Sequence, residues 1–324
     1  GATWNEVTSF PTKGGYTEGG RIISTEPFYA YIKIAEGCSN NCTYCAIPSI
    51  RGKYRSRRME DIVKEARWLA ENGVTELVVV AQDTTRYGED IYGKSMLPEL
   101  LTALCEIDGF KLIRTLYCYP ERITDELLDV IAKEDKLVKY LDMPIQHCDK
   151  TILKRMNRHG DRETLTALIK KIREKIQNVT LRTTLITGFP GETKEQFEEL
   201  CEFVKEIRFE RLGCFAYSPE EGTPAEKFED QVPLKDRERR AEIIMEEQMI
   251  ISDSLNEAAL DSEVEVVCEG FDRYAECYYG RSQADAPEID GKIFFLSEDK
   301  VRVGEYVKVK IDDTMDYDLI GSKM

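Results

Sequence analysis

The chain has little histidine and no long apolar run. Its 324 residues include two histidines and two tryptophans, and 45 basic against 61 acidic residues give a net charge of −16. No apolar stretch approaches the roughly 20 residues of a membrane-spanning helix, and the first ten residues lack the apolar core of a signal peptide. The shortage of cations argues against a general nucleic-acid binder, which must neutralise phosphates. We therefore expect a soluble, cytoplasmic protein with no membrane partner.

Cysteine is present but dilute. Ten cysteines in a chain of this length are too few for a disulfide-stapled scaffold, and the cytosol keeps thiols reduced. Seven stand alone, and an isolated cysteine is usually a small buried apolar residue. The other three, Cys38, Cys42 and Cys45, follow the first strand-like run with the spacing C-x3-C-x2-C. Such close spacing indicates metal or redox chemistry.

Short apolar runs alternate with amphipathic helical stretches in the first two thirds of the chain. Six such units in a row predict an α/β fold with a parallel sheet, either open and doubly wound or closed into a partial barrel. In both, ligands gather at the carboxyl ends of the strands. Thr193 and Gln196 predict a capping box at one helix start. The strand-like runs are 29–35, 76–81, 111–117, 139–142, 180–186 and 211–217, and the helix-like ones lie near 59–72, 96–106, 123–133, 162–177 and 193–207.

Composition divides the chain into four segments. Residues 1–27 are rich in glycine and have no apolar period, so we expect a flexible lead-in before a domain at 28–233. Residues 234–260 predict one long connecting helix. From 261 to 324 the apolar period becomes two and glycines punctuate it, which is typical of a small antiparallel β-barrel.

Three neighbouring thiolates can share one metal centre. A structural zinc site normally has four protein ligands, and both histidines, His147 and His159, lie more than a hundred residues from the triplet. A four-iron cluster held by three cysteines keeps one iron open for a ligand. We interpret His147 as a residue that caps a turn, with a mechanistic role as the alternative. A zinc knuckle remains the alternative for the cysteines.

The triplet after the first strand resembles the signature of the radical S-adenosylmethionine (SAM) enzymes, whose fold is a partial (β/α)6 TIM-like barrel. The resemblance implies a [4Fe-4S] cluster on Cys38, Cys42 and Cys45, whose open iron chelates SAM and whose electron cleaves it to a 5′-deoxyadenosyl radical. It also implies contacts with SAM from Tyr44, from Gln82 and Asp83 after the second strand, from Arg182, and from Ile186 and Gly188 in a glycine-containing turn. The alternatives are structural. Gln82 and Asp83 would form an ordinary polar turn, and Arg182 would be a solvated charge on a strand.

Further motifs resemble the methylthiotransferases of this family, in which a TRAM β-barrel follows the radical SAM barrel. Residues 47–52 resemble their motif after the cysteines, and 81–88, 141–147 and 280–291 resemble the branch that modifies the β-carbon of an aspartate in ribosomal protein twelve of the small subunit. The alternatives are a tRNA adenosine methylthiotransferase and a non-catalytic, metal-stapled binding module. Whole enzymes of this family carry an N-terminal domain with a second, sulfur-donating cluster. Residues 1–37 contain no cysteine, so we expect this chain to bind SAM without completing methylthiolation.

Charge indicates the partner. Residues 262–324 contain 15 acidic and 8 basic residues, a net charge of −7. An acidic barrel suits a basic ribosomal protein and makes tRNA an unlikely partner, with solubility as the plainer explanation. An electron donor is also required. A basic island at 51–58 would balance the charge of a cluster, bind an anionic substrate or be merely solvated. The acids expected to face the partner are Glu263, Glu265, Asp285, Glu288, Asp290, Asp312 and Asp313.

Overall fold

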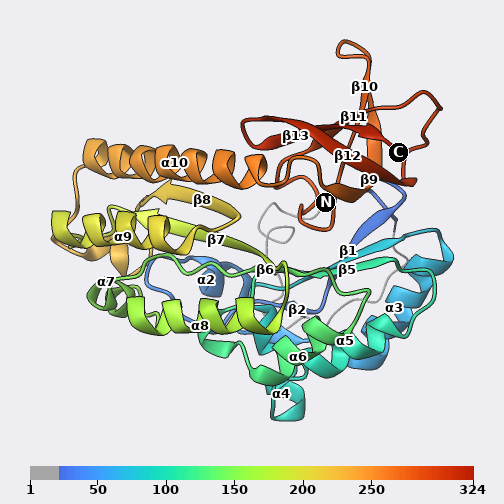
Figure 1. Cartoon of the computed structure of the whole chain (residues 1–324). Helices are drawn as coiled ribbons and strands as arrows, with labels where there is room; N and C mark the ends of the chain where they lie inside the picture. Colours follow the sequence, from blue (N-terminus) through green and yellow to red (C-terminus); the bar gives the residue numbers. More distant parts are fainter. Residues whose placement is uncertain (1–21) are drawn as a thin grey trace, which may run out of the picture.

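The predicted partial barrel is confirmed in the computed structural model, which describes residues 22–324 (Figure 1). Two parallel three-stranded sheets have the orders β1-β4-β5 and β6-β7-β8, and a parallel bridge between Ile113 and Leu137 joins them. The flexible lead-in predicted for residues 1–27 lies almost entirely outside the described residues. The strands are β1 (Tyr29–Lys33), β4 (Glu76–Val80), β5 (Leu112–Thr115), β6 (Tyr140–Asp142), β7 (Thr180–Thr187) and β8 (Arg211–Ala216).

Helices cover the outer face of these strands. The predicted capping box starts α9, where Thr193 Oγ1 accepts the amide of Gln196 and Gln196 Oε1 accepts the amide of Thr193. Short elements that the apolar period does not reveal fill the loops: β2 (Ala35–Glu36), β3 (Arg55–Ser56), α2 (Ile47–Arg51), α4 (Glu89–Tyr92) and α7 (Lys150–Arg155). The longer helices are α3 (Met59–Glu71), α5 (Leu97–Cys105), α6 (Asp125–Lys133), α8 (Arg162–Lys175), α9 (Lys194–Ile207) and α10 (Leu234–Glu257).

Alternation along the strands separates two cores. On β1, Ile32 faces the helices and belongs to the large core, whereas Tyr31 faces the inside of the barrel. Inside, Tyr31 joins Val78, Leu116 and Tyr140 around Ala286, a residue of the C-terminal domain. The interior of the partial barrel is therefore filled in part by a segment that comes from outside it.

The predicted small β-barrel is confirmed, with one difference in detail. Its five strands close in the order β10-β11-β13-β12-β9, and β11 and β13 pair in parallel while the other pairings are antiparallel. An odd number of strands cannot alternate in direction all the way round a closed ring, so one pairing must be parallel. The strands are β9 (Glu263–Asp272), β10 (Cys277–Arg281), β11 (Ile293–Leu296), β12 (Tyr306–Met315) and β13 (Asp318–Lys323).

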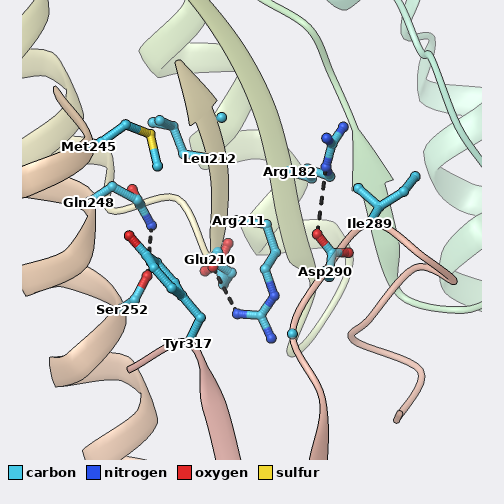
Figure 2. Close-up of a pocket in the computed structure, with 12 residues that line it drawn as sticks. Arg182, Glu210, Arg211, Leu212, Met245, Gln248, Ser252, Ile289, Asp290 and Tyr317 are labelled. Atoms are coloured by element: carbon cyan, nitrogen blue, oxygen red, sulfur yellow. Dashed lines mark hydrogen bonds and ion pairs between the residues drawn. The ribbon is translucent and has the colours of Figure 1, made fainter. Parts of the chain in front are cut away.

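The segment between β10 and β11, residues 282–291, closes the amino end of the large barrel, and we call it the plug. Arg211 at the start of β8 pairs with Asp285 at 2.6 Å, and the hydroxyl of Tyr140 at the start of β6 donates to Asp290 at 2.6 Å. Figure 2 shows Arg182 of β7 facing Asp290, whose carboxylate lies 3.6 Å from the guanidinium. The expectation that Asp285 and Asp290 face a partner is therefore wrong, because half-buried arginines of this chain neutralise both carboxylates.

Two arginines of the basic island, Arg55 and Arg57, are held by neighbouring residues. Arg57 pairs with Glu65 at 2.6 Å and donates to the carbonyl of Lys33, while Arg55 donates to the carbonyl of Lys53.

No helix among residues 22–324 is long and apolar enough to cross a membrane.

Candidate iron–sulfur and cofactor site

The cysteine loop leaves β2 through a turn that only glycine can form. Gly37 has a φ of +75°, and a Cβ there would lie 2.4 Å from the carbonyl oxygen of Lys53. The next amide, that of Cys38, donates to the carbonyl of Gly52 at 3.1 Å. This close approach of two backbone segments fixes the position at which the first cysteine leaves the strand.

The loop is tied down by side chains from distant segments. Asn40 Nδ2 donates to Asp83 at 2.9 Å, and Arg86 donates to Asn40 Oδ1 at 2.8 Å. Asn157, after α7, donates to the carbonyls of Asn40 and Asn41 at 3.0 and 3.1 Å. These contacts hold the backbone between the first two cysteines in place before any metal is bound.

The three thiols lie within electrostatic range of one another at the carboxyl ends of the strands. Burial raises the pKa of the Cys38 and Cys45 thiols, and the charge of Cys42 raises both further. Mutually repelling thiolates need cations between them, which iron supplies, so the donor set fits a cluster. No three His, Cys, Asp or Glu side chains among residues 22–324 are placed to hold a single metal ion, which needs its ligands closer together than a cluster does.

Two residues beside Cys42 were missed by the sequence analysis. The hydroxyl of Tyr119 lies 3.4 Å from Cys42 Sγ, and burial raises the pKa of Tyr119, which keeps the hydroxyl protonated and able to donate. The guanidinium of Arg158 lies 4.2 Å from the centre of the Tyr119 ring and pairs with Glu121 at 3.2 Å. Arg158 is 5% exposed. It places a buried positive charge near the thiols, and nothing in its local sequence distinguishes it from a surface arginine.

Replacing Arg158 by methionine should make the reduction potential of a reconstituted cluster more negative by several tens of millivolts, because nearby positive charge favours the reduced form. The measurement is a redox titration of the chain loaded with iron and sulfide. Arg51→Met is the matched control, since Arg51 belongs to the basic island and its side chain is 54% exposed. If the clusters of the two variants had equal reduction potentials, Arg158 would not be the residue that balances the charge of the cluster.

Two of the predicted SAM residues come together near the triplet. Tyr44 and Ile186 pack on one apolar cluster that also contains Met156, Phe189 and Tyr217. They come from the cysteine loop and the end of β7, so the carboxyl ends of non-adjacent strands share one wall. Their contact with SAM stays a prediction.

Gly188 has a structural reason to be glycine. Its φ is +67°, and a Cβ would lie 2.4 Å from Cγ of Arg237 on α10. Its amide donates to Glu192 Oε2 at 2.9 Å, and Glu192 Oε1 pairs with Arg240 at 2.7 Å. A larger side chain at Gly188 would therefore displace α10 as well as any ligand.

The other predicted SAM residues, Gln82, Asp83 and Arg182, do not belong to the apolar cluster of Tyr44 and Ile186. Gln82 is exposed and lines a cavity inside the barrel. Asp83 is fully buried and holds Asn40 of the cysteine loop, and Arg182 is engaged by Asp142 at 2.8 Å and by the plug. For these last two residues the described contacts are positioning contacts, and contact with SAM stays a prediction.

His147 caps a turn, as predicted. Its Nδ1 accepts the amide of Asp149 at 2.9 Å, and its side chain is fully buried. Its Nε2 lies 3.5 Å from Glu192. Glu192 thus joins the turn at Gly188, the turn at His147 and helix α10, a role that the sequence analysis did not find.

Comparison with known proteins agrees with this geometry. The model of the Radical SAM superfamily matches residues 32–204, and that of the TRAM domain matches residues 262–323. The ribosomal protein uS12 methylthiotransferase RimO of Clostridium tetani is 51% identical over 304 residues, covering 94% of this chain and 68% of that protein. The RimO of Clostridioides difficile is 52% identical over 301 residues, covering 93% and 68%.

Among solved structures, coproporphyrinogen III oxidase (HemN) from Escherichia coli, a radical SAM enzyme, aligns with a TM-score of 0.47 and 20% identity over 70% of this chain and 52% of that one. Half of the residues are shared with the two methylthiotransferases along nearly the whole of this chain. The chain therefore belongs to the radical SAM superfamily and, within it, to the family of ribosomal protein uS12 methylthiotransferases RimO.

Proposed function

We propose that this chain is the radical-generating part of a methylthiotransferase that modifies ribosomal protein uS12 at the β-carbon of an aspartate. The observation that carries the proposal is the identity of about one half, over 94% of the chain, to curated proteins named for that activity. The tRNA enzyme and the non-catalytic module find no comparable support. A ribosomal substrate would place the activity in the cytoplasm.

Residues of the cysteine loop and its neighbours would hold the cluster and balance its charge. Cys38, Cys42 and Cys45 would hold a [4Fe-4S] cluster, which together with SAM supplies, when bound, a 5′-deoxyadenosyl radical able to take a hydrogen atom from an unactivated carbon. Tyr119 and Arg158 would balance negative charge beside Cys42. The remaining steps of sulfur delivery need a sulfur source and an electron donor.

Other residues would shape the SAM side of the site. Tyr44 and Ile186 offer an apolar wall, and Gln82 a polar group at the cavity inside the barrel. The buried network around Glu192 holds the turn at Gly188 against α10. A turn fixed in this way can present its backbone to a ligand without reorganising.

Cleavage of SAM tests the radical half of this function. The chain, reconstituted anaerobically with iron and sulfide and reduced with dithionite, should release 5′-deoxyadenosine and methionine from SAM. The products are separated and quantified by chromatography with mass detection. The same protein without reconstitution is the control. Iron and sulfide incorporation without any cleavage would contradict a radical SAM role.

The acidic surface of the C-terminal barrel supports a basic partner. With Asp285 and Asp290 inside, and Glu265 paired with Lys111 at 2.6 Å, four of the expected acids remain as exposed carboxylates. They are Glu263, Glu288, Asp312 and Asp313. Such charges attract a cationic protein and repel tRNA, and their effect falls as salt screens them.

Neutralising these four acids together (Glu263→Gln, Glu288→Gln, Asp312→Asn, Asp313→Asn) should slow association with uS12 about tenfold at low salt and change dissociation little, because peripheral charges set the encounter rate. Surface plasmon resonance at two salt concentrations measures both rates. The matched control removes four exposed acids of the large barrel (Glu71→Gln, Glu106→Gln, Asp108→Asn, Asp135→Asn). Tight binding of tRNA, with no affinity for uS12, would instead favour the tRNA enzyme.

A further inference from the structure

A cavity of about 320 Å³ lies inside the partial barrel, and no role has yet been given to its one basic residue. Three neighbouring strands contribute their carboxyl ends, the region where barrel enzymes place their reacting groups. The volume is at the lower end of what ligand pockets occupy. The lining residues are Tyr31, Lys33, Ala35, Glu36, Val80, Ala81, Gln82, Leu116, Tyr117 and Ile289.

The cavity adjoins the cysteine loop on two sides. Ala35 and Glu36 form β2, which leads through Gly37 directly into Cys38. Gln82 precedes Asp83, whose carboxylate holds Asn40 between the first two cysteines. A side chain bound in the cavity would therefore lie next to the site proposed for the cluster and SAM.

We propose that Lys33 binds the carboxylate of the substrate aspartate in this cavity, and that Ile289 of the plug forms the opposite wall. The inference rests on the proposed function, in which the modified residue is an aspartate. A carboxylate that enters the cavity gives up part of its hydration and is stabilised by a cation there. Of the ten lining residues, Lys33 is the only basic one, and Glu36 is the only acidic one.

Lys33 is free to exchange its partner. Its Nζ lies 2.8 Å from Glu36 Oε2, with 49% of the Lys33 side chain exposed. Solvent-exposed ion pairs of this kind contribute little, and a substrate carboxylate can share or replace Glu36. The backbone beneath is fixed, because the carbonyl of Lys33 accepts Arg57 Nη1 at 2.8 Å.

The part of the cavity wall at Tyr117 is rigid. Tyr117 has a φ of +62°, a left-handed conformation that surrounding contacts must impose. Its amide donates to Asp142 at 3.0 Å, and its carbonyl accepts the amide and hydroxyl of Thr84 at 3.0 and 3.1 Å. A wall fixed before binding costs no ordering when the substrate arrives.

Ile289 reaches the cavity from the C-terminal domain. Its neighbour Asp290 is held by Arg182 and Tyr140, as Figure 2 shows for the arginine, and the hydroxyl of Tyr31 donates to the carbonyl of Pro287 at 3.3 Å. Ile289 also lines the second cavity, drawn in Figure 2, so it stands between the two spaces. The C-terminal barrel thus contributes to the shape of the proposed substrate site as well as to docking.

The test is a double-mutant cycle on the full 324-residue chain, with peptides that span the target aspartate of uS12 and carry either aspartate or asparagine there. Lys33→Gln should weaken binding of the aspartate peptide about tenfold, since a charge-assisted hydrogen bond is lost. It should leave binding of the asparagine peptide unchanged. Lys33→Arg should restore most of the preference for aspartate. The matched control is Lys94→Gln, because Lys94 forms a similar exposed pair with Glu99 away from the cavity.

A second pair of variants tests the opposite wall. Ile289→Trp should fill the cavity and weaken both peptides equally, whereas Leu296→Trp, an exposed position on β11, should weaken neither. Circular dichroism of each variant checks that the fold is kept.

Other results would overturn the assignment. If Lys33→Gln weakened both peptides equally, or neither, Lys33 would not recognise the carboxylate. If it weakened SAM binding and left the preference for aspartate intact, Lys33 would belong to the cofactor site. If the wild-type chain cleaved SAM but bound neither the peptides nor intact uS12, the proposed substrate itself would be wrong, and the assignment of Lys33 would fall with it.

Discussion

Replacing Cys38, Cys42 and Cys45 together by alanine should abolish the iron–sulfur chromophore of the reconstituted chain and reduce bound iron from about four atoms to none. The loop would still be held by Asn40, but it would present no thiolate to iron. The measurements are the visible absorption spectrum and iron and sulfide analysis after anaerobic reconstitution. SAM cleavage should disappear with the chromophore, because the cluster supplies the electron.

Cys105→Ala and Cys214→Ala are the matched controls. Burial raises the pKa of the Cys105 thiol to about 11 and that of the Cys214 thiol to about 12, and neither thiol belongs to the triplet that a cluster with three cysteine ligands needs. Cys105 is the last residue of α5 and packs in the core, and Cys214 lies on β8. Normal iron content in the triple variant, or loss of iron in either control, would contradict the assignment of the three ligands.

The barrel could be predicted because its signals are local. Within the predicted strand 76–81, residues 77–81 are continuously apolar, as expected of a parallel strand covered on both faces, and the structure has β4 (Glu76–Val80) there. The spacing of the cysteines is likewise contained in eight residues. Short elements such as α2 and β3 were not predicted, because five or two residues carry no measurable period and contacts within the fold decide their conformation.

The parts of the site that could not be predicted depend on contacts between distant segments. The Asp83 carboxylate holds Asn40 of the cysteine loop, and Arg182 pairs with Asp142 and Asp290. The local sequence does not reveal these contacts, and contact of either residue with SAM stays a prediction. The plug motif was noticed as a family resemblance, but the pattern of residues 282–291 does not reveal that the segment enters another domain. That the plug enters the large barrel is seen only in the structure, where its acids pair with arginines of β7 and β8.

The interface between the two barrels should contribute strongly to the stability of the chain, because a charge cluster joins the barrels beside the plug. Arg281, at the end of β10, pairs with Glu76 of β4 at 2.5 Å and with Glu269 of β9 at 2.6 Å. Glu76 also pairs with Arg114 of β5 at 3.1 Å. Glu76 and Arg114 are fully buried, Arg281 is 2% exposed and Glu269 is half-buried, so two arginines balance two glutamates and three of the four groups have almost no access to water.

Arg281→Ala should lower the free energy of unfolding by about 3–5 kcal/mol, because it leaves an excess of buried negative charge that water cannot solvate. Urea unfolding followed by circular dichroism measures the change. Lys310→Ala is the matched control: Lys310 pairs with Asp261 at 2.8 Å, but both side chains are exposed, so the loss should be much smaller.

Adding Glu76→Gln to Arg281→Ala should recover part of the lost stability, since it removes the carboxylate that the first change left unpaired. Amide hydrogen exchange locates the effect. In Arg281→Ala the plug at residues 282–291 should exchange faster, together with the amino ends of β4 and β5, while the cysteine loop at the opposite end of the strands should change less. Uniformly faster exchange, or a loss no greater than that of Lys310→Ala, would show that the two barrels are held together by their apolar contacts around Ala286 and that the charge cluster contributes little.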